Sequence, residues 1–157
     1  MIKTSRRMWI CSVLVALNLL FIWGNSLLPG TLSSLVSRFV GDVMEFLFHI
    51  PVNETQGGGH LIRKLAHFSE YACLGMLLCW LTAMMGERGF RMGATPAFLA
   101  LGAACVDETI QLFADGRASS LKDVWFDTAG AVAGIGLLLF AHYLTKAKKT
   151  YFRRKLQ

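Results

Sequence analysis

Three short stretches of the chain carry residue types that can move protons, hold anions or bind a cation. Carboxylates and histidine can act as general acids or bases, and carboxylate oxygens also ligate divalent cations. Lysine and arginine can hold a phosphate or a carboxylate. The candidate catalytic residues are His67, Asp107, Glu108 and Asp123. The candidate ligand-binding residues are Lys64, Glu70, Tyr71, Gln111, Arg117, Ser120 and Asp127.

The first stretch places its polar residues on one face of a helix. Lys64, His67 and Tyr71 are separated by three and four residues, and Gly75 continues the same face. Residues at these spacings are neighbours on a helix surface. Glu70 is three residues from His67 and is therefore expected beside it.

The other two stretches follow the same rule. Asp107 and Gln111 are one helical turn apart, as are Asp123 and Asp127. The face of Asp123 and Asp127 continues into the G-x-x-x-G of residues 130–134, a spacing that lets membrane helices approach closely. Polar groups aligned with small-residue faces are predicted to point into a helix bundle. Asp107, Glu108 and Asp123 could also hold a divalent cation there.

The elements that must position these residues follow from length and composition. The chain has 157 residues, of which 54% are hydrophobic and 17% charged, with a net charge of +6. Such a composition excludes a disordered chain and has fewer charges than an ordinary soluble domain. A nucleic-acid partner is not expected, because a soluble binder would not carry such long apolar runs. The sequence predicts a single all-α integral membrane domain over residues 1–157.

Four runs are predicted to span the membrane as a four-helix bundle, since a spanning helix needs about 20 mostly apolar residues. They cover about residues 8–28, 64–85, 96–114 and 121–144. The third run is short and contains Asp107 and Glu108, and it is counted because the flanking loops need it to change sides. The first run could instead be a signal peptide. Its length and the lack of a small-x-small cleavage site favour a retained helix.

Charge predicts the orientation of these helices. With a cytoplasmic N-terminus, the positive-inside rule is obeyed by every inner segment. The C-terminus and the basic tail 145–157 are then cytoplasmic as well. Eleven of the 16 basic residues lie on the inner side, namely Lys3, Arg6, Arg7, Arg88, Arg91, Lys146, Lys148, Lys149, Arg153, Arg154 and Lys155. The three polar stretches then meet at the outer face.

An additional amphipathic helix is predicted on the outer side over about residues 31–48. Its apolar residues recur at alternating spacings of three and four, which gives one continuous stripe. Such a helix could lie flat in the outer headgroup region, or it could cap the bundle. The pattern leaves both open.

Taken together, the motifs resemble those of the VanZ-like family over roughly residues 10–145. They read Lys64-x-x-His67-Phe68-x-Glu70-Tyr71-x-x-Leu74-Gly75, Asp107-Glu108-x-x-Gln111-x-Phe113 and Gly116-Arg117-x-x-Ser120-x-x-Asp123, followed by Asp127-x-x-Gly130. These small bacterial membrane proteins are named for a member linked to teicoplanin resistance. The resemblance implies a multi-pass protein of the bacterial cytoplasmic membrane with a link to the envelope or to glycopeptide resistance. The family pattern often has Asn where this chain has Asp127.

Three functions compete. The first is an outer pocket that binds or modifies a membrane lipid or a lipid-linked envelope precursor. The second is ion- or proton-coupled transport, which suits ionisable residues within spans, although the inner halves of the spans are nearly free of them. The third is a non-catalytic membrane partner protein. The residue pattern does not decide whether the protein is an enzyme.

Overall fold

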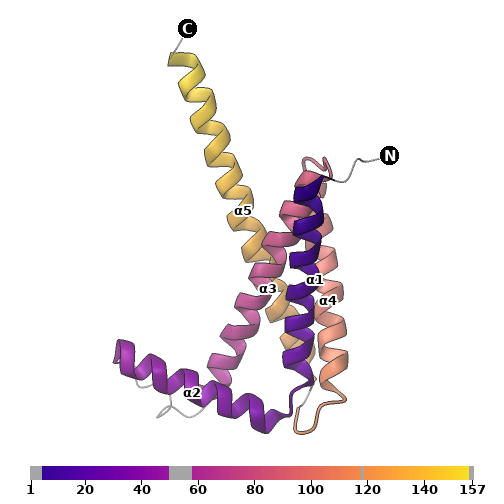
Figure 1. The fold of residues 1–157 in the computed structure, drawn as a ribbon, viewed down its shortest axis with the longest axis vertical. Coiled ribbons are helices and arrows are strands. Elements are labelled where there is room, and N and C mark those ends of the chain that lie inside the picture. The colour runs from indigo at the N-terminus through magenta and orange to yellow at the C-terminus, as the bar shows by residue number, and fades with distance from the viewer. Residues whose placement is uncertain (1–4, 50–57, 118, 156–157) are drawn as a thin grey trace.

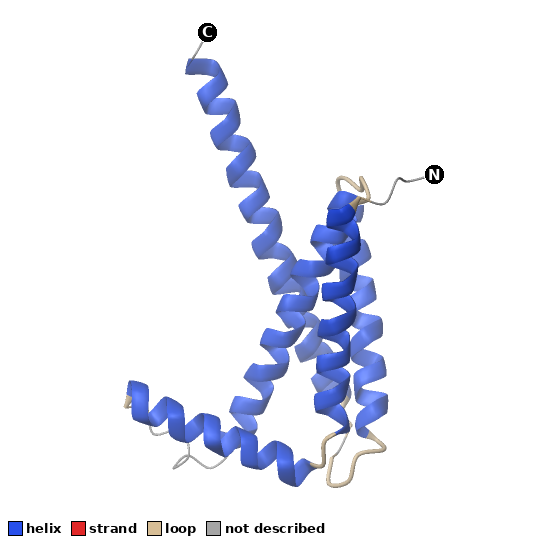
Figure 2. Cartoon of the chain, in the orientation of Figure 1, coloured by secondary structure: helices blue, strands red, loops and turns tan. Residues whose placement is uncertain are grey.

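The computed structural model describes residues 5–49, 58–117 and 119–155, and within these ranges it contains only helices, turns and loops (Figure 2). The predicted all-α class is confirmed. The five helices are α1 (Arg6–Leu27), α2 (Gly30–Phe48), α3 (Gly58–Met84), α4 (Arg91–Gln111) and α5 (Leu121–Lys155). Residues 50–57, between α2 and α3, lie outside the described residues.

Four of the helices pack together and the remaining one crosses their ends (Figure 1). Helix α3 contacts α1, α2, α4 and α5, and α4 also contacts α1 and α5. The start of α1, the turn between α3 and α4, and the far end of α5 lie on one side of the molecule. Helix α2 and the loop between α4 and α5 lie on the opposite side. The chain therefore runs back and forth through the four packed helices.

The closest approach is between α3 and α5, where glycines allow the two backbones to touch. A Cβ atom on Gly130 would lie 2.5 Å from the carbonyl oxygen of Phe68. A Cβ on Gly134 would collide with the backbone of Ala72, and one on Gly75 with the backbone of Ala131. The predicted close-packing role of the 130–134 motif is confirmed, because only glycine fits at these positions.

The ends of α1 and α2 are defined by local chemistry. The hydroxyl of Ser5 accepts a hydrogen bond from the Met8 amide at 3.3 Å and caps the start of α1. Leu28 is extended, as expected of a residue before proline, so α1 ends there. The next helix begins at Gly30, whose amide donates to the carbonyl of Asp115 at 3.0 Å. The α1–α2 junction is thereby joined to the α4–α5 loop.

The predicted bounds of the fourth helix were wrong. The sequence indicated a helix over residues 96–114 that began near Pro96, but α4 begins at Arg91 and ends at Gln111. Pro96 lies inside the helix and cannot donate to the carbonyl of Met92, four residues earlier. The thiol of Cys79 donates to that carbonyl at 3.5 Å, so a neighbouring helix supplies the missing donor. A contact of this kind is invisible in a local sequence pattern.

Two other helices are longer than predicted. Helix α3 begins at Gly58, six residues before the predicted start at residue 64. Helix α5 continues to Lys155, beyond the predicted end at residue 144 and through most of the basic tail. Lysine and arginine are good helix formers and no proline interrupts them, which explains the continuation. The first two helices end within two residues of their predicted bounds.

Two helices of the described chain are long and apolar enough to cross a membrane. They are Arg6–Leu27 and Leu121–Lys146. Large apolar side chains such as Leu20, Phe98 and Phe140 are more than half exposed, whereas Asp107 and Asp127 are buried. The molecule therefore exposes many large apolar side chains and buries several acids, which is unusual for a soluble domain.

Candidate functional site

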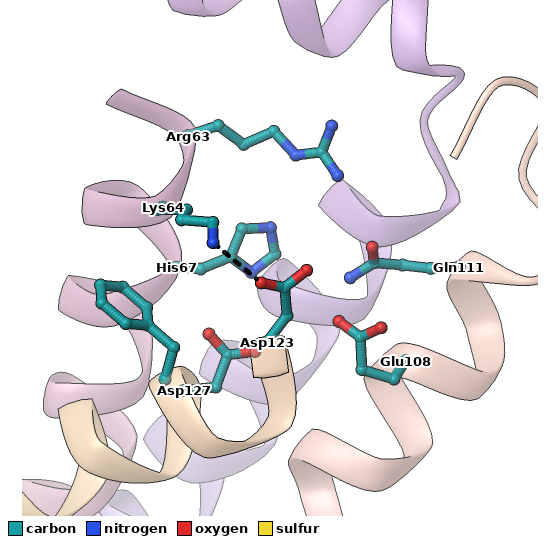
Figure 3. Close-up of a pocket in the computed structure, with 8 residues that line it drawn as sticks. Arg63, Lys64, His67, Glu108, Gln111, Asp123 and Asp127 are labelled. Carbon is teal, nitrogen blue, oxygen red and sulfur yellow. Dashed lines mark ion pairs between the residues drawn. The ribbon is translucent and has the colours of Figure 1, made fainter. Parts of the chain in front are cut away.

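A small polar cavity lies between α3, α4 and α5, at the end of the molecule near α2. Its volume is about 30 Å³, which is room for one or two water molecules or an ion. Figure 3 shows side chains from the three helices directed toward the same space. The cavity is lined by Arg63, Lys64, His67, Glu108, Gln111, Asp123, Phe126 and Asp127. Six of the eleven residues selected from the sequence are among them.

Lys64 and Asp123 form an ion pair across the cavity mouth. The Nζ of Lys64 lies 3.3 Å from Oδ1 of Asp123, and about a third of each side chain is exposed. The same ammonium group lies 5.8 Å from the ring centroid of Phe126, within cation–π range. Asp123 is therefore already partnered by a cation, and pairs this exposed contribute little to stability.

His67 lies between two carboxylates. Its Nδ1 atom is 3.8 Å from Oδ2 of Asp107 and 3.9 Å from Oε2 of Glu70. Glu70 is held from α1, because the side-chain amide of Asn25 donates to its Oε1 at 3.0 Å. The predicted proximity of His67 and Glu70 is confirmed. The imidazole lies within reach of two groups that can accept or return a proton.

Asp107 is the most buried acid, with no exposed surface. The side-chain amide of Gln111 donates to its Oδ2 at 3.1 Å, as the one-turn spacing predicted. The same amide nitrogen lies 3.5 Å from the hydroxyl oxygen of Ser26 on α1. The other carboxylate oxygen of Asp107, Oδ1, has no hydrogen-bond partner among the described residues.

Glu108 and Ser120 are joined through the backbone. The Ser120 amide donates to Oε2 of Glu108 at 2.7 Å, so this acid holds the start of α5. The Ser120 hydroxyl accepts a bond from the Lys122 amide at 3.2 Å. Glu108 is 4% exposed, and its Oε1 atom is buried without a partner in the described chain. Asp127, on the next turn of α5 after Asp123, is 2% exposed.

Arg117 caps the end of α1 from the α4–α5 loop. Its Nε donates to the carbonyl of Leu28 at 2.9 Å, and its Nη2 donates to the carbonyl of Asn25 at 2.8 Å. A cation is favourable at this end of a helix, where carbonyls lack partners. Burial, followed by the charge of Arg63, lowers the pKa of the Arg117 guanidinium from its ordinary value. Arginine nevertheless stays charged at neutral pH.

A second and larger cavity adjoins the first, between α1, α2 and α3. Its volume is about 240 Å³. One part of its wall is apolar, with Phe21, Leu28 and Val36, and another part carries Arg63 and Arg117. The remaining lining residues are Asn25, Ser33, Ser37, Ala66, His67 and Glu70. Arg63 and His67 border both cavities, so the two spaces meet at these side chains.

Tyr71 lies apart from both cavities. It is fully buried and belongs to the hydrophobic core with Ile22 and Leu74. Its hydroxyl has no hydrogen-bond partner among the described residues. The structure thus does not bring this predicted ligand-binding residue to the cavity walls.

Sequence reasoning missed three residues that line or support the cavities. Arg63 borders both of them, and it was not among the candidate site residues. Asn25 and Ser26 connect α1 to the polar cluster, because Asn25 contacts Glu70 and Ser26 contacts Gln111. Their signal was a polar pair at the end of an otherwise apolar run, which by itself indicates only a membrane boundary.

The donor atoms best placed for a metal ion differ from the set suggested by the sequence. Oxygen or nitrogen atoms of His67, Asp107 and Asp127 lie within 4.8 Å of one another. Asp123, an expected ligand, is instead paired with Lys64. Glu108, the other expected ligand, accepts a hydrogen bond from the backbone amide of Ser120 through one of its oxygens.

The fold and the cluster define a class of small all-helical proteins with an apolar exterior and ionisable side chains gathered inside one end. The model of the VanZ/LLP1 family matches residues 8–142, and the chain belongs to this family. The resemblance noted from the motifs is thereby confirmed. No curated protein and no solved structure matches the chain.

Proposed function

We propose that this protein is a multi-pass protein of the bacterial cytoplasmic membrane that binds the polar headgroup of an envelope lipid or lipid-linked wall precursor at its outer face. The observation that carries the proposal is the 240 Å³ cavity between α1, α2 and α3. It combines an apolar wall with two arginines and opens beside the buried acids. An amphiphile with an anionic headgroup has the complementary pattern.

The exterior of the molecule supports a membrane location. Two helices have the length and apolar character of spans, and the polar residues of α3 and α4 are directed inward. With four spans, the start of α1 and the end of α5 share one side, as Figure 1 shows for the ribbon. Most of the basic residues belong to that side, which makes it cytoplasmic by the positive-inside rule.

Helix α2 supports the same orientation. Its apolar stripe is uncovered, and Phe39 is 68% exposed while Ser37 on another face is 6% exposed. A helix that capped the bundle would bury its apolar stripe against the other helices. We therefore infer that α2 lies in the outer headgroup region with its stripe in lipid.

The charged lining suggests how a headgroup is held. Arg63 and Arg117 border the larger cavity, and guanidinium groups bind phosphate through paired hydrogen bonds. Arg117 has one buried nitrogen, Nη1, without a partner in the described residues. His67, Asp107 and Glu108 are the groups placed to act as acid or base on a bound headgroup.

Transport receives less support than binding. The buried ionisable residues of the described chain, Asp107, Glu108 and Asp127, all lie at the α2 end. At the other end the buried polar side chain is Thr82, whose hydroxyl donates to backbone carbonyls of its own helix. A proton or ion path would need ionisable groups along the whole length.

The proposal is tested by the lipid that the purified protein retains. We expect native mass spectrometry of the full chain to show a bound phosphate-bearing lipid. Arg63→Gln should lower its retention at least about tenfold, because a charge-assisted contact to phosphate is lost. Lys122→Gln is the matched control, since Lys122 is exposed and lines neither cavity. Equal retention by both variants would contradict the proposal.

A cellular readout follows from the family. Membership of the VanZ/LLP1 family supports a contribution to teicoplanin resistance. We expect expression of the parent chain to raise the teicoplanin concentration that inhibits growth, and Arg63→Gln to abolish the increase while leaving the protein in the membrane. A resistant Arg63→Gln strain would separate the cavity from the phenotype.

A further inference from the structure

We propose that His67, Asp107 and Asp127 form a site for one divalent transition-metal ion of the Zn²⁺ or Mn²⁺ type. The three side chains come from three helices, α3, α4 and α5. Their donor atoms lie within 4.8 Å of one another, beside the small polar cavity. The site does not depend on the proposed headgroup binding, although an ion held here would lie next to a headgroup bound in the larger cavity.

The separations are close to those of a bound ion. Two ligands of a tetrahedral zinc lie about 3.4 Å apart when each bond is about 2.1 Å. Nδ1 of His67 and Oδ2 of Asp107 are separated by 3.8 Å. The donor atoms lie at most 4.8 Å apart, and small rotations of the three side chains would bring them to the distances of a bound ion.

Unpartnered atoms provide the second, independent observation. The side chain of Asp107 has no exposed surface, and yet its Oδ1 atom has no hydrogen-bond partner among the described residues. Nδ1 of His67 and Oε1 of Glu108 are also buried without partners. Buried polar groups are nearly always satisfied, because leaving one unpaired costs about 1–3 kcal/mol. These unpaired oxygen and nitrogen atoms lie around one space, and a bound cation would satisfy them together.

The charge balance indicates a cation. In the part of the chain that the structure describes, no lysine or arginine forms an ion pair with Asp107, Glu108 or Asp127. The Lys64 ammonium group is paired with Asp123, and Arg117 donates to backbone carbonyls. Buried carboxylates need a positive partner or a proton. A divalent ion supplies two positive charges at the point where the carboxylates converge.

The ligand types favour a particular class of ion. One imidazole nitrogen with two carboxylate oxygens suits zinc, manganese and similar ions, whereas calcium and magnesium take oxygen ligands. The adjoining cavity has room for water to complete the coordination. Gln111 holds Oδ2 of Asp107 and fixes the orientation of this carboxylate, as residues behind metal ligands commonly do.

The experiment measures metal in the full-length protein, purified in lipid-free detergent and stripped with a chelator. Zn²⁺, Mn²⁺, Mg²⁺ and Ca²⁺ are added separately, and bound metal is determined by elemental mass spectrometry and titration calorimetry. We expect one equivalent of Zn²⁺ or Mn²⁺ per chain, and a rise in the unfolding temperature with that ion. Mg²⁺ and Ca²⁺ should bind at least about tenfold more weakly.

Variants locate the ion. Asp127→Asn and His67→Asn should each weaken binding at least about tenfold and abolish the metal-dependent rise in unfolding temperature. Asp115→Asn is the matched control, since Asp115 is exposed and borders neither cavity. Less than a tenth of an equivalent in the parent, or equal binding by Asp127→Asn and the parent, would overturn the site.

The two proposals fail separately. Arg63→Gln should retain metal while losing lipid, because Arg63 is not one of the three ligands. Loss of lipid binding with metal retained would leave the metal site in place and remove only the headgroup proposal. Absence of metal with lipid retained would remove the metal site and leave the headgroup proposal in place. For the parent and for Arg63→Gln, the helical circular dichroism signal of the chelator-treated sample is measured. This measurement distinguishes unfolding from loss of a ligand.

Discussion

Arg117 shows how a single side chain serves both the fold and the candidate site. Two of its nitrogens donate to carbonyls at the end of α1, and the third is buried at the wall of the larger cavity. The residue joins the α4–α5 loop to the first helix. Its removal therefore affects stability as well as any ligand.

We expect Arg117→Ala to lower the free energy of unfolding by about 1–3 kcal/mol, because hydrogen bonds from a charged donor are lost and helix carbonyls are left unpaired. The measurement is thermal or denaturant unfolding in detergent. Lys122→Ala, which changes an exposed cation near the same loop, should alter stability by less than about 0.5 kcal/mol. Equal effects of the two substitutions would argue against the capping role.

Contacts within the candidate site were predictable from the sequence where the two residues lie three or four positions apart on one helix. The alignment of His67 with Glu70, and of Asp107 with Gln111, follows from three- and four-residue spacings and is present in the structure. The contact between Asn25 and Glu70 spans 45 positions, so no local pattern predicts it. The preference of Asp123 for Lys64 likewise depends on how two helices are placed.

At the scale of elements, the crossing of α3 and α5 holds the polar cluster together. His67 and Asp127 lie on these two helices. The glycines at the crossing, Gly75, Gly130 and Gly134, come after them in the sequence of each helix. A wider separation of the helices would pull apart the donors of the proposed metal site. The small residues are thus part of what positions the site.

We expect Gly134→Val to destabilise the protein by at least about 3 kcal/mol or to prevent its folding, because the added atoms meet the backbone of Ala72 and cannot be moved aside. Gly136→Val is the matched control, since a Cβ there meets nothing within 4 Å. Yield and monodispersity in detergent, followed by thermal unfolding, distinguish the two. A well-folded Gly134→Val protein would show that the helices do not cross closely.

The helices themselves were largely predictable, since apolar runs and stripes gave all five elements. The start of α4 was missed because proline usually marks the first turn of a helix. Here the thiol of Cys79 donates to the carbonyl that Pro96 leaves free. The extension of α5 was missed because a run of basic residues was interpreted by its charge rather than by its helix propensity.

At the scale of the whole molecule, the apolar exterior and the one-sided polar cluster give the proposed orientation a direct test. Alkaline phosphatase is active only outside the cytoplasm, whereas green fluorescent protein fluoresces well inside it. We expect phosphatase activity for a fusion after Asp115 and fluorescence for a fusion after Gln157. A phosphatase fusion after Glu87 should be inactive. Activity at Glu87 with none at Asp115 would reverse the topology and place the cluster in the cytoplasm.

The length of α5 determines how far this helix extends beyond the other helices. Its 35 residues extend about 52 Å at 1.5 Å per residue, whereas the hydrocarbon core of a bilayer is about 30 Å thick. The far half leaves the other helices and projects by itself (Figure 1). In the proposed orientation, a helix that starts at the outer rim would therefore continue roughly 20 Å past the inner edge of the hydrocarbon. The far half of α5 carries the basic residues of the tail, and it belongs to the same continuous helix as Asp123 and Asp127.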